Sequence, residues 1–150
     1  MIPARARTSG SHKALNHWAL VWFTLLEHDW VSLAIVPAEG RASAISVARA
    51  LTDIGNSYEE HSVQLIEAEH LPVPIARQVI ATMTHRAESG SRTIIAVSSP
   101  IVDYNAIPIA RAADASILLV PLGATEVAEA KRVLGMIGRD CFIGSITSEP

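Results

Sequence analysis

The chain alternates short apolar runs with longer stretches of helical periodicity. Apolar runs rich in β-branched residues cover 31–36, 62–67, 92–97, 115–120 and 141–146. Runs of this length that stay apolar at consecutive positions are typical of strands covered on both faces. Helices are predicted between them, over 41–54, 74–88, 104–113 and 125–138. Three glycines lie where these helices should end, at Gly55, Gly90 and Gly138.

Five strands joined by four crossover helices predict an α/β fold. We expect a three-layer sandwich, with a mostly parallel five-stranded sheet and helices on both faces. The organisation predicted is one domain over 14–150, preceded by a flexible N-terminal tail over 1–13.

An apolar block over 19–26 precedes the first strand. It is too short to cross a bilayer, which needs about 20 residues, and it lacks the features of a secretory signal. Its large side chains recur at helical spacing. A helix here is therefore expected either to form an interface or to pack on its own domain.

Charge and composition narrow the function classes. The formal net charge is −3 over 150 residues, with no long run of one sign, which argues against a nucleic-acid partner. Cys141 is the single cysteine, so an intrachain disulfide is excluded and a reducing cytoplasm is expected. The six histidines show no metal-ligand spacing, so no metal site is predicted, although His70 lies near the mouth of the expected site.

The loop after the first predicted strand has the outline of a phosphate-binding turn. Such loops combine glycines that open backbone N–H groups to phosphate, a lysine that neutralises charge, and a Ser or Thr for magnesium. Here the loop reads "PAEGRASA", and its candidate residues are Glu39, Gly40, Arg41 and Ser43. Arg41 is its only cation, and arginine does not replace lysine neutrally because its planar fork is bulkier.

Polar residues also follow the next strands. Glu67 and Glu69 lie two positions apart, so they share one face if the strand stays extended, and they then either act together or are solvated acids. Ser98 and Ser99 end the following strand, and Thr125 opens the last predicted helix.

Together these pieces resemble the bacterial tyrosine kinases of polysaccharide export and, more broadly, the MinD/ParA group of P-loop ATPases. The chain has "AEGRAS" and "VARAL" where that family has "GEGKST" and "LARAL", and "LIEAEHLP" where the family has "LIDADLRRP". It has "IIAVSSP" and "DYNAIPIARAADASILLVP" where the family has "IIDTPP" and "D…ALALARLADGVLLVV". The resemblance covers about residues 14–147 and implies a degenerate P-loop NTPase-like fold.

The resemblance also shows what is missing. It places Arg41 or Gly40 at the phosphate lysine, Ala96 at the third-strand aspartate, and Glu67 and Glu69 at a pair of aspartates. Thr125 matches a family threonine. Phosphoryl transfer depends on positioning and charge neutralisation. These losses together should therefore cost several kcal/mol of transition-state stabilisation, and each ~1.4 kcal/mol corresponds to a tenfold lower rate. The chain is therefore predicted not to be an enzyme and to hold no cofactor.

The first functional hypothesis is a non-catalytic pseudokinase or pseudo-ATPase module that acts by protein–protein contact. It would regulate or scaffold a bacterial surface-polysaccharide biosynthesis or export system. Its partner would be a membrane-associated component that recruits it to the inner membrane, and a homo-oligomer is a further expectation. The candidate interface is the N-terminal helix, through Trp18, Trp22 and Phe23.

Two alternatives stay open. In the first, the chain is a weak ATP or ADP sensor, or a tyrosine-kinase-like ATPase, that binds the nucleotide with Mg²⁺ and uses Arg41 in place of the lysine. In the second, the fold is receiver-like or hydrolase-like, with Ser98 and Ser99 at the reactive strand end. A G-x-S-x-G elbow around these serines is lacking, which disfavours the second alternative.

Overall fold

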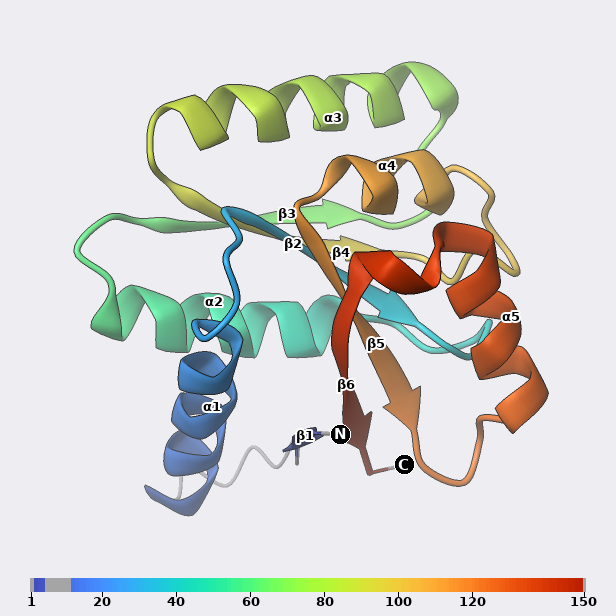
Figure 1. The fold of residues 1–150 in the computed structure, drawn as a ribbon, viewed down its shortest axis with the longest axis horizontal. Coiled ribbons are helices and arrows are strands. Elements are labelled where there is room, and N and C mark those ends of the chain that lie inside the picture. The colour runs from blue at the N-terminus through green and yellow to red at the C-terminus, as the bar shows by residue number, and fades with distance from the viewer. Residues whose placement is uncertain (1, 5–11, 150) are drawn as a thin grey trace.

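A computed structural model of the chain describes residues 2–4 and 12–149 (Figure 1). Its strands are β1 (Ile2–Ala4), β2 (Ser32–Pro37), β3 (Val63–Ala68), β4 (Arg92–Val97), β5 (Ala115–Pro121) and β6 (Phe142–Ser148). Its helices are α1 (His12–Leu25), α2 (Ile45–Tyr58), α3 (Val73–Glu88), α4 (Ala106–Ala112), α5 (Val127–Ile137) and the short 3₁₀ helix η1 (Arg139–Cys141).

The strands form one sheet in the order β1-β6-β5-β2-β4-β3, and every neighbouring pair is parallel. Helices α1 and α2 cover one face, whereas α3, α4 and α5 cover the other (Figure 1). The predicted three-layer α/β architecture and its five strands are confirmed. An additional strand, β1, pairs with β6 within the segment predicted as a flexible tail, and residues 5–11 of that tail lie outside the described residues.

β2 lies at the centre of the sheet, and all six of its residues are buried. Because side chains alternate along a strand, Leu33 and Ile35 join the core beneath α1 and α2, whereas Ala34 and Val36 join the core beneath α3, α4 and α5. This burial on both faces is the physical reason that the sequence of β2 is apolar at consecutive positions.

Trp22 holds α1 against the sheet and against α2. Its side chain is fully buried and meets Trp30 edge-on, with 5.7 Å between the ring centroids. Trp30 in turn donates its indole N–H to the Leu25 carbonyl at 2.8 Å, and the Arg92 guanidinium stacks over its ring. This aromatic cluster fixes the end of α1 beside the start of β2.

Gly55 was expected to end α2, and this prediction is wrong, because the helix continues to Tyr58. A Cβ atom at residue 55 would lie only 2.7 Å from Trp22 Cη2, so the glycine permits the close approach of α1 and α2. Gly90 and Gly138 do follow the ends of α3 and α5, with φ of 80° and 119°, as predicted.

Two hydrogen-bonding arrangements fix other element ends. The Asp114 carboxylate accepts from the N–H groups of Val31 and Ser32, and the Ser32 hydroxyl accepts from the N–H of Asp114, which ties the start of β2 to the start of β5. Arg111 donates to the carbonyls of Met136 and Ile137 at the end of α5, where orphan acceptors need partners. Within the described part of the chain, no helix combines the length and apolar character needed to cross a membrane.

Gly55→Ala should lower the free energy of unfolding by about 1–3 kcal/mol, because the new methyl group overlaps the Trp22 ring. The matched control is Gly135→Ala in α5, where a Cβ meets nothing within 4 Å. There the better helix propensity of alanine should raise the same free energy by about 0.5–1 kcal/mol. Urea denaturation followed by circular dichroism measures both, and a stabilising Gly55→Ala would contradict the packing described.

Candidate functional site

The candidate site lies at the carboxyl end of the sheet, where the loops after β2, β3, β4 and β5 gather. β2 continues through α2 toward β3 on one side, whereas its neighbour β5 continues through α5 toward β6 on the other. Adjacent parallel strands whose connections leave in opposite directions form a topological switch point, the usual ligand position in such sheets.

The loop between β2 and α2 is held close to the sheet. The Ala38 N–H donates to the Leu119 carbonyl at 2.8 Å, and the Ala42 N–H donates to the Glu39 carbonyl at 3.1 Å, which closes a turn around Gly40. A Cβ at Gly40 would lie 2.8 Å from Cγ1 of Val102, in the loop after β4. The glycine therefore accommodates a neighbouring side chain that covers its backbone.

Glu69 occupies the amino end of α2. Its Oε1 accepts from the Ser43 hydroxyl at 2.7 Å and from the Ala44 N–H at 3.1 Å, and the same hydroxyl accepts from the Ile45 N–H at 3.2 Å. The amino end of a helix carries free N–H groups and a partial positive charge, so it attracts anions. Here a carboxylate from the chain itself takes that place.

Glu67 is engaged elsewhere on the same helix. Its Oε1 accepts from Nε and Nη2 of Arg49, at 3.1 and 2.5 Å. The two side chains are 61% and 44% exposed for Arg49 and Glu67, so the pair contributes little to stability. The shared face expected of Glu67 and Glu69 required an extended strand through both residues, but β3 ends at Ala68 and the chain bends at Glu69. Each carboxylate bonds to a different part of α2, and the two form no joint site in this structure.

The loop after β3 turns sharply at His70, whose φ of 52° lies in the left-handed region. Histidine enters this region more readily than most residues, and the His70 N–H donates to the Ser98 hydroxyl at 2.9 Å. The side-chain amide of Asn105 donates to the Leu71 carbonyl at 2.8 Å. The loops after β3 and β4 are therefore bonded to each other.

Ser98 and Ser99 are almost fully buried, with 3% and 1% exposed. The Ser98 hydroxyl accepts from the backbone of His70, and the Ser99 carbonyl accepts from the N–H groups of Val102 and Asp103. Both serines hold loop backbone rather than face an open cleft, which disfavours the hydrolase-like alternative.

Arg41 and Thr125 remain at the same end of the molecule. Arg41 is exposed and makes neither a hydrogen bond nor an ion pair with any residue that the structure describes. The Thr125 hydroxyl is buried and has no hydrogen-bond partner in the described part of the chain. α5 begins after it, at Val127, with Glu126 as the N-cap. Within residues 2–4 and 12–149, no three His, Cys, Asp or Glu side chains group in a way that would hold a metal ion.

Two of the three predicted interface residues are corrected by the structure. Trp18 is 8% exposed and Trp22 fully buried, because both face the core shared by α1, α2 and the sheet. Neither is available to a partner. Phe23 lies on the opposite side of α1 and is 48% exposed. Helical spacing identified the helix, but it did not show which stripe of apolar residues faces inward.

Other exposed apolar side chains surround the candidate site, and the sequence analysis did not single them out. They are Val102, Tyr104, Leu122 and Val127, each between 46% and 72% exposed. Two hollows of about 400 and 370 Å³ lie away from this edge, one beside α5 and β6 and one between α3 and β3.

Comparison with known proteins adds no family to this description. No protein-family model matches the chain, and no curated protein matches its sequence. The class that the fold itself defines is a three-layer α/β protein with an all-parallel sheet and loops gathered at a switch point.

Glu69→Ala should lower the free energy of unfolding by about 1 kcal/mol, because the amino end of α2 loses its acceptor. Glu69→Gln should lower this free energy by less, since its amide oxygen still accepts hydrogen bonds from Ser43 and Ala44. Glu39→Ala is the control in the adjoining loop, because the Glu39 side chain makes no hydrogen bond with a described residue. Urea unfolding midpoints compare the three variants, and equal midpoints for Glu69→Ala and Glu39→Ala would contradict a capping role.

Proposed function

We propose that this chain is a non-catalytic, ATPase-like module that acts by protein–protein contact, as a regulator or a scaffold. The observation that carries the proposal is the Glu69 carboxylate at the amino end of α2. In phosphate-binding loops a phosphate group takes this place, with backbone N–H groups and a lysine around it.

A phosphate that entered this site would meet three obstacles. It would have to displace Glu69 from Ser43 and Ala44 or accept the repulsion of that carboxylate. It would also meet Val102, which lies against Gly40. Arg41 is the one cation in the loop, and a single exposed charge compensates weakly because water and salt screen it.

Contact with another protein is supported by the exposed apolar side chains. Leu20 and Phe23 on α1 and Tyr58 at the end of α2 are 64%, 48% and 55% exposed, and the rings of Phe23 and Tyr58 are in contact. Exposed apolar groups that gather on one surface commonly mark interaction sites. A surface-polysaccharide system with a membrane-associated partner is the setting suggested by the sequence resemblance alone.

A second candidate is a weak ATP or ADP sensor, and the free guanidinium of Arg41 favours it. Because Arg41 is exposed and engages no described residue, it is available to a nucleotide phosphate. The two candidates differ in whether the unmodified chain binds nucleotide at all.

Isothermal titration with Mg-ATP and Mg-ADP separates the two candidates. We expect no binding by the unmodified chain at micromolar nucleotide. Binding with a micromolar Kd that Arg41→Ala weakens about tenfold or more would overturn the non-catalytic proposal in favour of the sensor.

A second measurement tests the blocking role of Glu69 directly. On adding inorganic phosphate, the amide NMR signals of residues 40–47 should stay unchanged in the unmodified chain and shift in Glu69→Ala, where the anion place is vacated. Shifts of equal size in both proteins would show that Glu69 does not block the site.

A further inference from the structure

Three exposed apolar side chains form a patch on the outer layer of the molecule, here called the α1–α2 patch. Leu20 and Phe23 lie on α1, and Tyr58 is the last residue of α2. They are 64%, 48% and 55% exposed. The rings of Phe23 and Tyr58 meet edge to face, with 4.8 Å between their centroids, so the patch presents a paired aromatic surface to solvent.

Unpaired carboxylates lie on the chain segments that continue from this patch. Glu27 lies just beyond the end of α1, Asp29 lies two residues further, and Glu60 lies two residues after Tyr58. All three are exposed, and none of them forms an ion pair with a residue that the structure describes.

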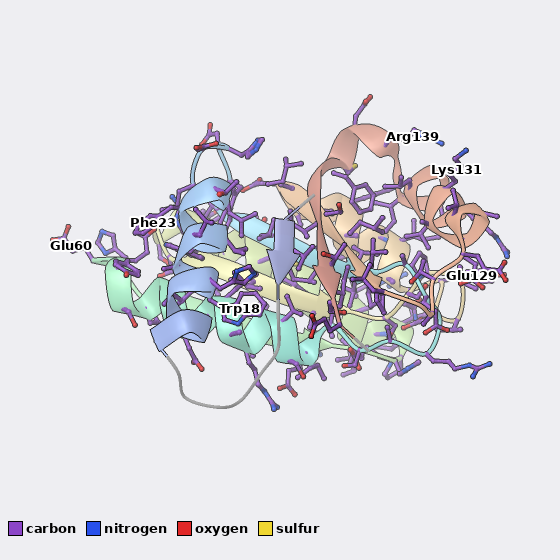
Figure 2. The ribbon with its side chains drawn as sticks, turned by 90° about the horizontal axis from the view of Figure 1, so that it is seen from below. Trp18, Phe23, Glu60, Glu129, Lys131 and Arg139 are labelled. Atoms are coloured by element: carbon purple, nitrogen blue, oxygen red, sulfur yellow. The ribbon has the colours of Figure 1, made fainter. Side chains whose placement is uncertain are left out.

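Neighbouring arginines do not offset these charges. Arg49 is paired with Glu67, and Arg92 is paired with Glu59. Figure 2 shows Phe23 and Glu60 at one end of the molecule and Glu129, Lys131 and Arg139 at the opposite end. The chain segments that continue from the aromatic surface therefore carry three carboxylates, Glu27, Asp29 and Glu60, that no described cation pairs with.

We propose that the α1–α2 patch docks a basic amphipathic helix of a protein partner. Apolar side chains on one stripe of that helix would cover Leu20, Phe23 and Tyr58, and Lys or Arg beside the stripe would face the carboxylates. The inference rests on the proposed contact function and specifies the chemistry of the partner.

Charge distinguishes this occupant from two others. An anionic bilayer surface attracts Lys and Arg, and it would repel a patch bordered by Glu27, Asp29 and Glu60. A symmetric dimer through the same patch would bring the identical carboxylates of two copies together, which is unfavourable. A basic protein segment is the occupant that complements both the apolar and the charged groups.

The test uses the full chain and a synthetic peptide of about 18 residues, with Leu and Trp along one helical stripe and Lys and Arg beside it. Fluorescence anisotropy should show saturable binding. A counterpart with Glu in place of every Lys and Arg should not bind. Absence of binding by the basic peptide, or equal binding by both peptides, would overturn the proposal.

Matched variants locate the binding surface. The chain has two tyrosines, Tyr58 in the patch and Tyr104 on the loop after β4, and both are exposed. Tyr58→Ala should raise the Kd of the peptide about tenfold, because an exposed aromatic anchor is lost. Tyr104→Ala should leave this Kd unchanged. The leucine pair should behave in the same way: Leu20→Ser should weaken peptide binding, whereas Leu122→Ser should not. Equal losses of affinity for the two variants of either pair would show that the peptide binds elsewhere.

Charge reversal tests the electrostatic part. Glu60→Lys should weaken peptide binding and reduce its salt dependence. Glu126→Lys, at the exposed N-cap of α5, should change neither. Co-sedimentation of the chain with vesicles of anionic lipid would overturn the proposal in favour of a membrane surface. Dimerisation of the chain that Tyr58→Ala abolishes would overturn it in favour of a second copy. The nucleotide titrations do not depend on this patch, so a failure here is distinguishable from failure of the proposed function.

Discussion

The structure depends on the complete enclosure of β2. Both faces of this strand are covered by helices, and both edges are hydrogen-bonded, to β4 on one side and to β5 on the other. A strand enclosed in this way loses contact with water through side chains and backbone alike, so apolar side chains are favoured there. Its buried hydroxyl, on Ser32, accepts a hydrogen bond from the N–H of Asp114. The loop that follows it therefore starts from a fixed point at the centre of the sheet, where loops from the neighbouring strands meet.

Because that loop is fixed, a carboxylate of the chain itself can occupy the anion-binding position at the amino end of α2. Glu69 is covalently part of the chain and lies two residues beyond Glu67 of β3, so its carboxylate cannot diffuse away from Ser43 as a free ligand can. A tethered group competes with a free ligand at an effective concentration in the millimolar range or higher. The same hydrogen bonds that stabilise the start of α2 thereby disfavour a phosphate, and the fold remains intact without one.

Most of the fold could be predicted from the sequence, because strands enclosed on both faces leave consecutive apolar runs. Two features required tertiary information. The sequence predicts a helix end at Gly55, whereas the role of this glycine depends on the Trp22 ring, which is distant in sequence. Trp18 and Trp22 were read as interface residues, although the inward stripe of α1 is decided by contact with α2 and the sheet.

The candidate site was predictable only in part. The sequence placed Glu67 and Glu69 at the end of a strand, but their partners, Arg49 and Ser43, lie 18 and 26 positions away. No local pattern encodes such a pairing. Nor does the sequence indicate the left-handed backbone of His70, since that conformation follows from its bond to Ser98.

The pairing of β1 with β6 has a consequence for how the chain is threaded. The two strands are parallel neighbours, with Ile2 opposite Ile146 and Ala4 opposite Ser148. The end of β6 therefore lies only a short step from the start of β1, and a linker of a few residues would join them (Figure 1). A circular permutant reopened at the exposed turn around Gly90 would keep every strand neighbour of the sheet. Both chain ends would then lie in the turn that precedes β4.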